Sequence, residues 1–125
     1  MFVVNSDGTI YLTRGDIAAL EIGARKSDTE NYMFQVGDEV RFKVFEKNKC
    51  DDVVICKTIT IEEETELVVI NLTQSDTKIG ELIHKPKDYW YEVELNPDTS
   101  PQTIVGYDMD GPKILRLFPE GGEPV

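Results

Sequence analysis

The chain alternates apolar and polar residues in short stretches, and this period of two is typical of β-strands with one buried face. Polar turns separate these stretches about every ten residues. The predicted strands span residues 2–5, 9–13, 17–24, 39–46, 53–61, 66–73, 88–95, 102–107 and 113–118. No apolar pattern of helical period is long enough for a crossover between parallel strands. We therefore expect an all-β domain, and favour an antiparallel β-sandwich of the Greek key type over a partly open barrel.

Four polar segments are predicted to turn the chain. The Ser-Asp-Gly sequence at 6–8 is a strong signal for a hairpin. The three glutamates at 62–64 are expected to form the solvated tip of another hairpin, and the Asp-Met-Asp-Gly sequence at 108–111 is expected to close the last two strands into a pair. Segment 73–80 begins with an N-cap residue and ends with glycine, so it predicts the one short helical turn of the domain, near residues 75–79.

The alternation also assigns one face of each strand to the core. In strand 88–95, Tyr89, Tyr91, Val93 and Leu95 share the inward face, and the residues between them lie on the wetter face. The predicted core consists of Leu20, Ile22, Phe42, Val44, Ile55, Val68, Ile70, Leu72, Tyr91, Val93 and Ile104.

Length and charge limit the organisation and the partners. The 125 residues predict a single domain, 1–118, followed by a flexible tail, 119–125, that has no core-forming pattern. The formal net charge is −11, whereas a nucleic acid is bound through clustered lysine and arginine, so nucleic acid is not an expected partner. The N-terminal MFVVNSDG has neither the basic leader of a signal peptide nor the length of a membrane span. We expect cytoplasmic synthesis, no secretion by a signal peptide and no membrane partner.

The spacing of the cysteines and the histidine predicts no metal site and no cofactor. Cys50 and Cys56 are six residues apart, which matches no zinc or redox motif, and His84 is the single histidine. We expect two free thiols, with Cys56 packed on a strand face as a small hydrophobe and Cys50 in the polar loop before that strand.

Other motifs give no catalytic constellation. The Arg-Gly-Asp tripeptide at 14–16 resembles an integrin-binding motif, but it lies between two apolar strands and is expected to be a turn. Asp108 and Asp110 resemble the opening of a calcium loop, but no closing glutamate follows at the required position. The chain has no Gly-x-Ser-x-Gly elbow and no glycine-rich phosphate loop. We therefore expect no enzymatic activity.

The aromatic residues provide the one candidate for an interaction site. Trp90 lies on the wetter face of strand 88–95, between Asp88 and the two carboxylates Glu92 and Glu94. Aromatic residues on an exposed sheet face either anchor a protein interface or stack on sugar rings. Trp90, Glu92 and Glu94 are the predicted interface residues, and the alternative is a single edge-packed tryptophan with no binding role, which is the commoner case.

Several segments together resemble a known family. IYLTRGDIAALEI is followed by GDEVRFKV, LTQSDTKIGELI, YWYEVEL and QTIVGYD. This order is similar to the immunoglobulin-like N-terminal domain of phage baseplate upper proteins and of related small prophage tail proteins of Gram-positive bacteria, and the likeness spans residues 9–118. The immunoglobulin Cys…Trp…Cys arrangement is absent, so an antibody-type domain is not supported.

The resemblance implies a non-enzymatic structural component of a phage or prophage tail or baseplate, acting as an assembly or adaptor domain. Its partners would be other virion or tail proteins, or further copies of itself, and it would end in the virion particle after cytoplasmic synthesis. The alternative is a carbohydrate- or surface-binding β-sandwich module that uses Trp90 or the acidic turns.

Overall fold

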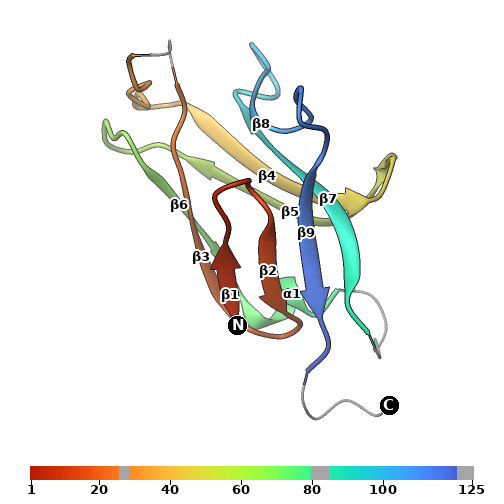
Figure 1. Cartoon of the computed structure of the whole chain (residues 1–125). Coiled ribbons are helices and arrows are strands. Elements are labelled where there is room, and N and C mark those ends of the chain that lie inside the picture. The colour runs from red at the N-terminus through yellow and green to blue at the C-terminus, as the bar shows by residue number, and fades with distance from the viewer. Residues whose placement is uncertain (26–28, 80–84, 121–125) are drawn as a thin grey trace.

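The computed structural model describes residues 1–25, 29–79 and 85–120. Over these residues the chain forms nine strands and one helical turn (Figure 1). They are β1 (Phe2–Val4), β2 (Ile10–Thr13), β3 (Ala18–Ile22), β4 (Glu39–Glu46), β5 (Lys49–Thr60), β6 (Val68–Leu72), α1 (Gln74–Thr77), β7 (Lys87–Leu95), β8 (Gln102–Val105) and β9 (Lys113–Phe118).

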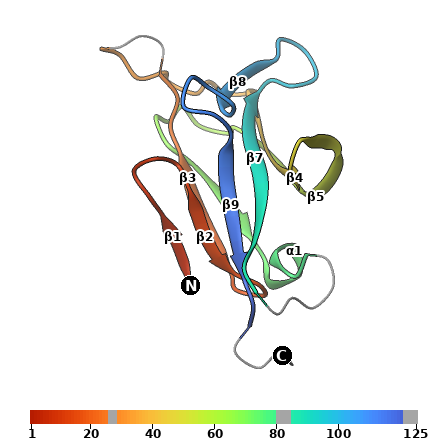
Figure 2. The same cartoon turned by 45° about the vertical axis from the view of Figure 1, so that its right-hand side comes forward.

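The strands form two sheets, which confirms the prediction of an all-β sandwich. The larger sheet has the order β1-β2-β9-β7-β4-β5, which Figure 2 shows from left to right, and β8 also pairs with β7. The smaller sheet pairs β3 with β6. One pair departs from the expected antiparallel arrangement, because β2 and β9 run parallel. Parallel neighbours need a long connection, and nearly the whole chain lies between these two strands.

The last two strands do not pair with each other, so that prediction was wrong. β9 pairs with β7 from Lys87 to Tyr91, and β8 pairs with β7 from Val93 to Leu95. β4 occupies the other side of β7, so β8 and β9 follow one another along the same side. β7 is nine residues long and offers enough backbone for both partners. The segment 106–112 between them leaves the sheet as an excursion with the predicted tight turn at its tip, where Asp108 and Gly111 exchange backbone hydrogen bonds of 3.0 and 3.1 Å.

The acidic residues 62–64 connect the two sheets and are not a hairpin tip as predicted. β5 pairs with β4 in the larger sheet, whereas β6 pairs with β3 in the smaller one. A strand pattern gives the buried face of a strand but not its neighbour, and this explains the error. The three glutamates are exposed, so the expected solvation is confirmed.

The surroundings of both cysteines differ from the prediction. A turn at Lys47 and Asn48, with φ of +60° at Asn48, lets β5 begin at Lys49, so Cys50 belongs to the strand and not to a loop. Cys56 follows the buried Ile55 and therefore points outward, where it is exposed rather than packed. Both thiols are free.

The core lies between the two sheets. Every predicted core residue is buried except Ile104, which lies on the short strand β8, is half-buried and packs against the border of the core. The β7 side chains Tyr89, Tyr91, Val93 and Leu95 are all buried, as the alternation predicts. Burial raises the pKa of Tyr91 to about 12, with a smaller contribution from Asp7.

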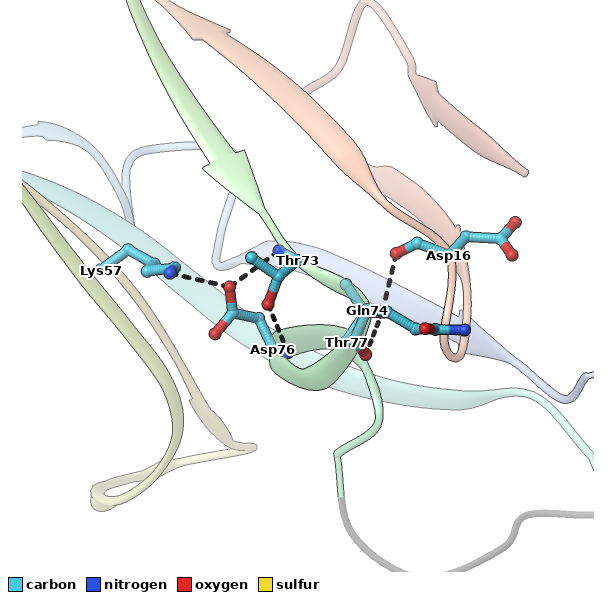
Figure 3. A network of polar contacts seen from close by, with 6 residues as sticks. All are labelled: Asp16, Lys57, Thr73, Gln74, Asp76 and Thr77. Carbon is cyan, nitrogen blue, oxygen red and sulfur yellow. Dashed lines mark hydrogen bonds and ion pairs between the residues drawn. The ribbon is translucent and has the colours of Figure 1, made fainter.

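The helical turn α1 connects three parts of the fold at one corner, as Figure 3 shows. Thr73 is the N-cap: its hydroxyl accepts a hydrogen bond from the Asp76 N–H (3.2 Å), and the Asp76 carboxylate accepts one from the Thr73 N–H (2.8 Å). This reciprocal arrangement is a capping box. The Asp76 carboxylate also pairs with Lys57 of β5 (2.9 Å), and the Thr77 hydroxyl donates to the Asp16 carbonyl (2.7 Å). The predicted helical turn is confirmed here.

Some predictions concern residues that the structure does not describe, or residues next to them. The predicted helix stop Gly80 and the histidine His84 lie outside the described residues. Glu120 belongs to the predicted tail, and its carboxylate lies 3.9 Å from the Arg14 guanidinium. Residues 121–125 are also outside the described part, so the boundary at 118 stays a prediction.

Candidate interaction surface around Trp90

Strand β7 places the three predicted interface residues on the outer face of the larger sheet. Its inward side chains are buried, and Trp90, Glu92 and Glu94 alternate with them at intermediate exposure. β7 lies between β4 on one side and β8 and β9 on the other, so Trp90 stands opposite Phe45 of β4 and Ile114 of β9. Trp90 therefore lies on an inner strand of the sheet, where it is half-buried.

Trp90 packs against a side chain from the excursion between β8 and β9. The rings of Trp90 and Tyr107 meet edge to face, with centroids 5.9 Å apart and planes at 62°. Tyr107 is 72% exposed, and Met109 at the tip of the same excursion is fully exposed. The turn is possible because Gly111 adopts a φ of +99°, which glycine tolerates. The excursion thus places an exposed aromatic ring beside Trp90 and carries an exposed methionine at its tip.

The two glutamates of the predicted site differ in their surroundings. The Glu92 carboxylate forms an ion pair with Lys43 of β4 at 3.2 Å, and the Lys43 ammonium also lies 5.8 Å from the centroid of Phe45. Glu94 forms no ion pair within the described part of the chain, because Arg41, which stands opposite it, pairs with Asp98 at 3.2 Å. Paired charges therefore border Trp90, and only Glu94 offers an unpaired carboxylate.

An ion pair that sequence reasoning missed extends this surface toward β2. Arg116 of β9 donates two hydrogen bonds to Asp88 of β7, and its guanidinium lies 5.9 Å from the centroid of Tyr11. Tyr11 in turn meets Phe118 edge to face at 6.0 Å. The signal for this ion pair was present, since Asp88 and Arg116 both alternate with buried residues, but its use required knowing that β7 and β9 are neighbours.

The other candidate motifs are structural. Arg14 is buried and donates from Nε to the Ile79 carbonyl at 3.2 Å, so the Arg-Gly-Asp tripeptide forms the expected turn. The Asp108 carboxylate pairs with Lys113 at 3.0 Å and accepts from the Asp110 N–H. These contacts lower the pKa of Asp108 and occupy the carboxylate that a calcium ion would need. Over residues 1–25, 29–79 and 85–120, no group of three or more His, Cys, Asp or Glu side chains could hold a metal ion.

No protein-family model, curated protein or solved structure matches this chain. The described residues include no helix long and apolar enough to cross a membrane. The arrangement around Trp90 offers aromatic contact area beside charged pairs, a combination that is found at protein interfaces.

Proposed function

We propose that this chain is a non-enzymatic assembly domain of a phage or prophage tail or baseplate, and that it docks on another virion protein through the surface around Trp90. One observation carries the proposal: the rings of Trp90 and Tyr107 are in contact, Tyr107 is largely exposed, and Met109 in the same excursion is fully exposed. Aromatic residues and methionine are enriched at protein interfaces, and tryptophan and tyrosine are the commonest energetic anchors.

The surroundings of the group have the composition of an interface rim. The ion pair between Lys43 and Glu92 lies next to Trp90, and Glu94 adds an unpaired carboxylate among the described residues. A polar rim around an aromatic centre keeps water from the central contacts. This arrangement supports docking through Trp90 with Glu92 and Glu94 at the border.

The order of strand pairing supports the family resemblance. In immunoglobulin-type sandwiches strands B and E pair in one sheet, and strands C, F and G with C′ form the other. β3 and β6 correspond to B and E, while β5, β4, β7 and β9 follow the order C′, C, F and G. The chain would then be an immunoglobulin-like domain whose second sheet is reduced to two strands.

The carbohydrate module is the alternative, and the geometry favours it less. A sugar ring stacks on a flat aromatic face, whereas the rings of Trp90 and Tyr107 are inclined at 62° and do not form a common platform. Glycan binding is therefore the competing outcome of the test below.

The test measures binding of the purified chain to the products of the genes adjacent to its own, and in parallel to a panel of polysaccharides. Trp90→Ala should weaken binding to the protein partner about 30-fold, as expected for an interface anchor. Leu67→Ala is the matched control, because Leu67 is 55% exposed but lies in the segment before β6. Specific binding to a polysaccharide that Trp90→Ala abolishes, without any protein partner, would replace this proposal by the carbohydrate module.

A further inference from the structure

A basic pocket lies at one end of this acidic molecule. It has a volume of about 590 Å³ and is lined by Glu46, Lys47, Lys49, Pro86, Lys87, Asp88 and Arg116. Four of these side chains are basic and two are acidic, in a chain with a formal net charge of −11. The turn between β4 and β5, the start of β7 and the end of β9 bring them together. The pocket is therefore a local exception to the charge of the chain.

The cations of the basic pocket are only partly neutralised. Lys87 pairs with Glu46 at 3.0 Å, and Arg116 is engaged by Asp88. Lys47 and Lys49 are exposed and form no ion pair with any residue that the structure describes. Two ammonium groups are thus available to an incoming carboxylate.

The opposite end of strand β5 carries unpaired carboxylates. β5 begins at Lys49 in the basic pocket and ends at Thr60, two residues before the acidic turn, which we define as residues 62–66 with its four glutamates. At about 3.3 Å per residue the two ends of this 12-residue strand are roughly 36 Å apart. In Figure 1 the β4–β5 turn and the connection after β5 lie on opposite sides of the molecule. None of the four glutamates forms an ion pair within the described ranges.

We propose that the basic pocket binds the acidic turn of a second copy of this chain, so that copies associate head to tail. Charge complementarity selects this occupant, because the rest of the acidic surface repels another copy and these two ends attract. A contact between two different surfaces repeats from copy to copy and gives a ring or an open chain. The inference rests on the proposed assembly function and adds a second contact to it, since Trp90 does not line the basic pocket.

The proposed contact is electrostatic, so its test compares association at two salt concentrations. At about 0.15 M salt the Debye length is about 8 Å, so repulsion between distant acidic surfaces is screened and ion pairs in contact are not. At about 1 M the length falls to about 3 Å and the contact pairs are screened as well. Sedimentation velocity should therefore show concentration-dependent association of the wild-type chain at the first salt concentration and its loss at the second.

A charge exchange tests the two surfaces together. The pocket variant Lys47→Glu/Lys49→Glu has two acidic ends, and the turn variant Glu62→Lys/Glu63→Lys keeps the basic pocket but has a turn without net charge, so each alone should associate at least about tenfold more weakly than wild type. In an equimolar mixture the unaltered pocket of the turn variant meets the unaltered turn of the pocket variant, and association between the two variants should return to within about threefold of wild type. The two variants move the net charge of −11 by the same amount in opposite directions, so the mixture keeps the mean wild-type charge.

The controls separate this inference from the proposed function. Thermal melts of both variants should match wild type, because all four substituted side chains are exposed. A wild-type chain that stays monomeric at every concentration, or a mixture of folded variants that does not associate, would overturn the head-to-tail contact. If Trp90→Ala nevertheless loses the adjacent-gene partner, only this contact is wrong. If the charge exchange succeeds while Trp90→Ala changes no binding, the proposed Trp90 surface is wrong and the self-association stands.

Discussion

Arg116 donates two hydrogen bonds to Asp88 across the β7–β9 pair, 2.7 Å from Nε to Oδ1 and 3.1 Å from Nη2 to Oδ2. The paired, planar geometry is the strong form of an arginine–carboxylate contact. The Arg116 guanidinium lowers the pKa of Asp88 below its usual value, although partial burial of the carboxylate opposes the shift. Arg116 also lies over the Tyr11 ring, and both residues of the pair line the basic pocket.

The first prediction concerns Asp88→Asn, which should lower the free energy of unfolding by about 1 kcal/mol at neutral pH. The folded-state pKa lies below the unfolded value, so this stability is present above the unfolded pKa and is lost as the pH falls through the folded one. The difference between wild type and variant should therefore shrink below about pH 4. Urea titrations over this range measure it, with Asp52→Asn on exposed β5 as the control. An equal difference at every pH would mean that the variant acts through packing.

The second prediction concerns the cap of α1. Thr73→Ala removes the hydroxyl that accepts from the Asp76 N–H, and the loss of such an N-cap typically costs about 1 kcal/mol. Ser75→Ala is the matched control, because Ser75 is exposed in the same turn. Denaturant unfolding should separate the two variants. Equal stability would show that the contacts of Asp76 with Lys57 and of Thr77 with Asp16 keep this corner in place without the cap.

The strand faces and the helical turn could be predicted from the sequence because their causes are local. The bounds of β4 and β9 match the predicted ranges 39–46 and 113–118, since alternating apolar residues must face one core. The capping box of Thr73 and Asp76 needs only residues three apart. The inward face of β7, and with it the outward position of Trp90, followed from the same alternation.

Which strands are neighbours could not be predicted, because alternation carries no information on partners or direction. The parallel pairing of β2 with β9, and the placement of β8 and β9 along one side of β7, are tertiary facts. The neighbours of Trp90 and Glu92 in the candidate site could not be predicted for the same reason. Tyr107 reaches Trp90, and Lys43 reaches Glu92, only because separate segments meet on β7.

The third prediction tests the assignment of faces in β6. Ile70 is fully buried and its neighbour Val69 is 45% exposed on the opposite face. Ile70→Ala should lower the free energy of unfolding by about 2–5 kcal/mol through lost contacts and a residual cavity. Val69→Ala should change it by less than about 0.5 kcal/mol, as for most surface substitutions. Denaturant titrations in which Val69→Ala loses more stability than Ile70→Ala would mean that the strand is shifted by one residue.

The last prediction concerns the contact between Trp90 and Tyr107. Trp90 is the single tryptophan of the chain, so tryptophan fluorescence reports the surroundings of this one side chain. Tyr107→Ala removes the ring that covers the indole edge at 5.9 Å, and the emission should shift to longer wavelength and become more accessible to a soluble quencher. The variant should lose less than about 0.5–1.5 kcal/mol of stability, the range of an aromatic pair, because Tyr107 is largely exposed. Met109→Ala, at the fully exposed tip of the same excursion, is the control and should leave the emission unchanged. If Tyr107→Ala also leaves it unchanged, the excursion does not rest on Trp90 in solution, and the aromatic pair that carries the proposed docking surface is absent.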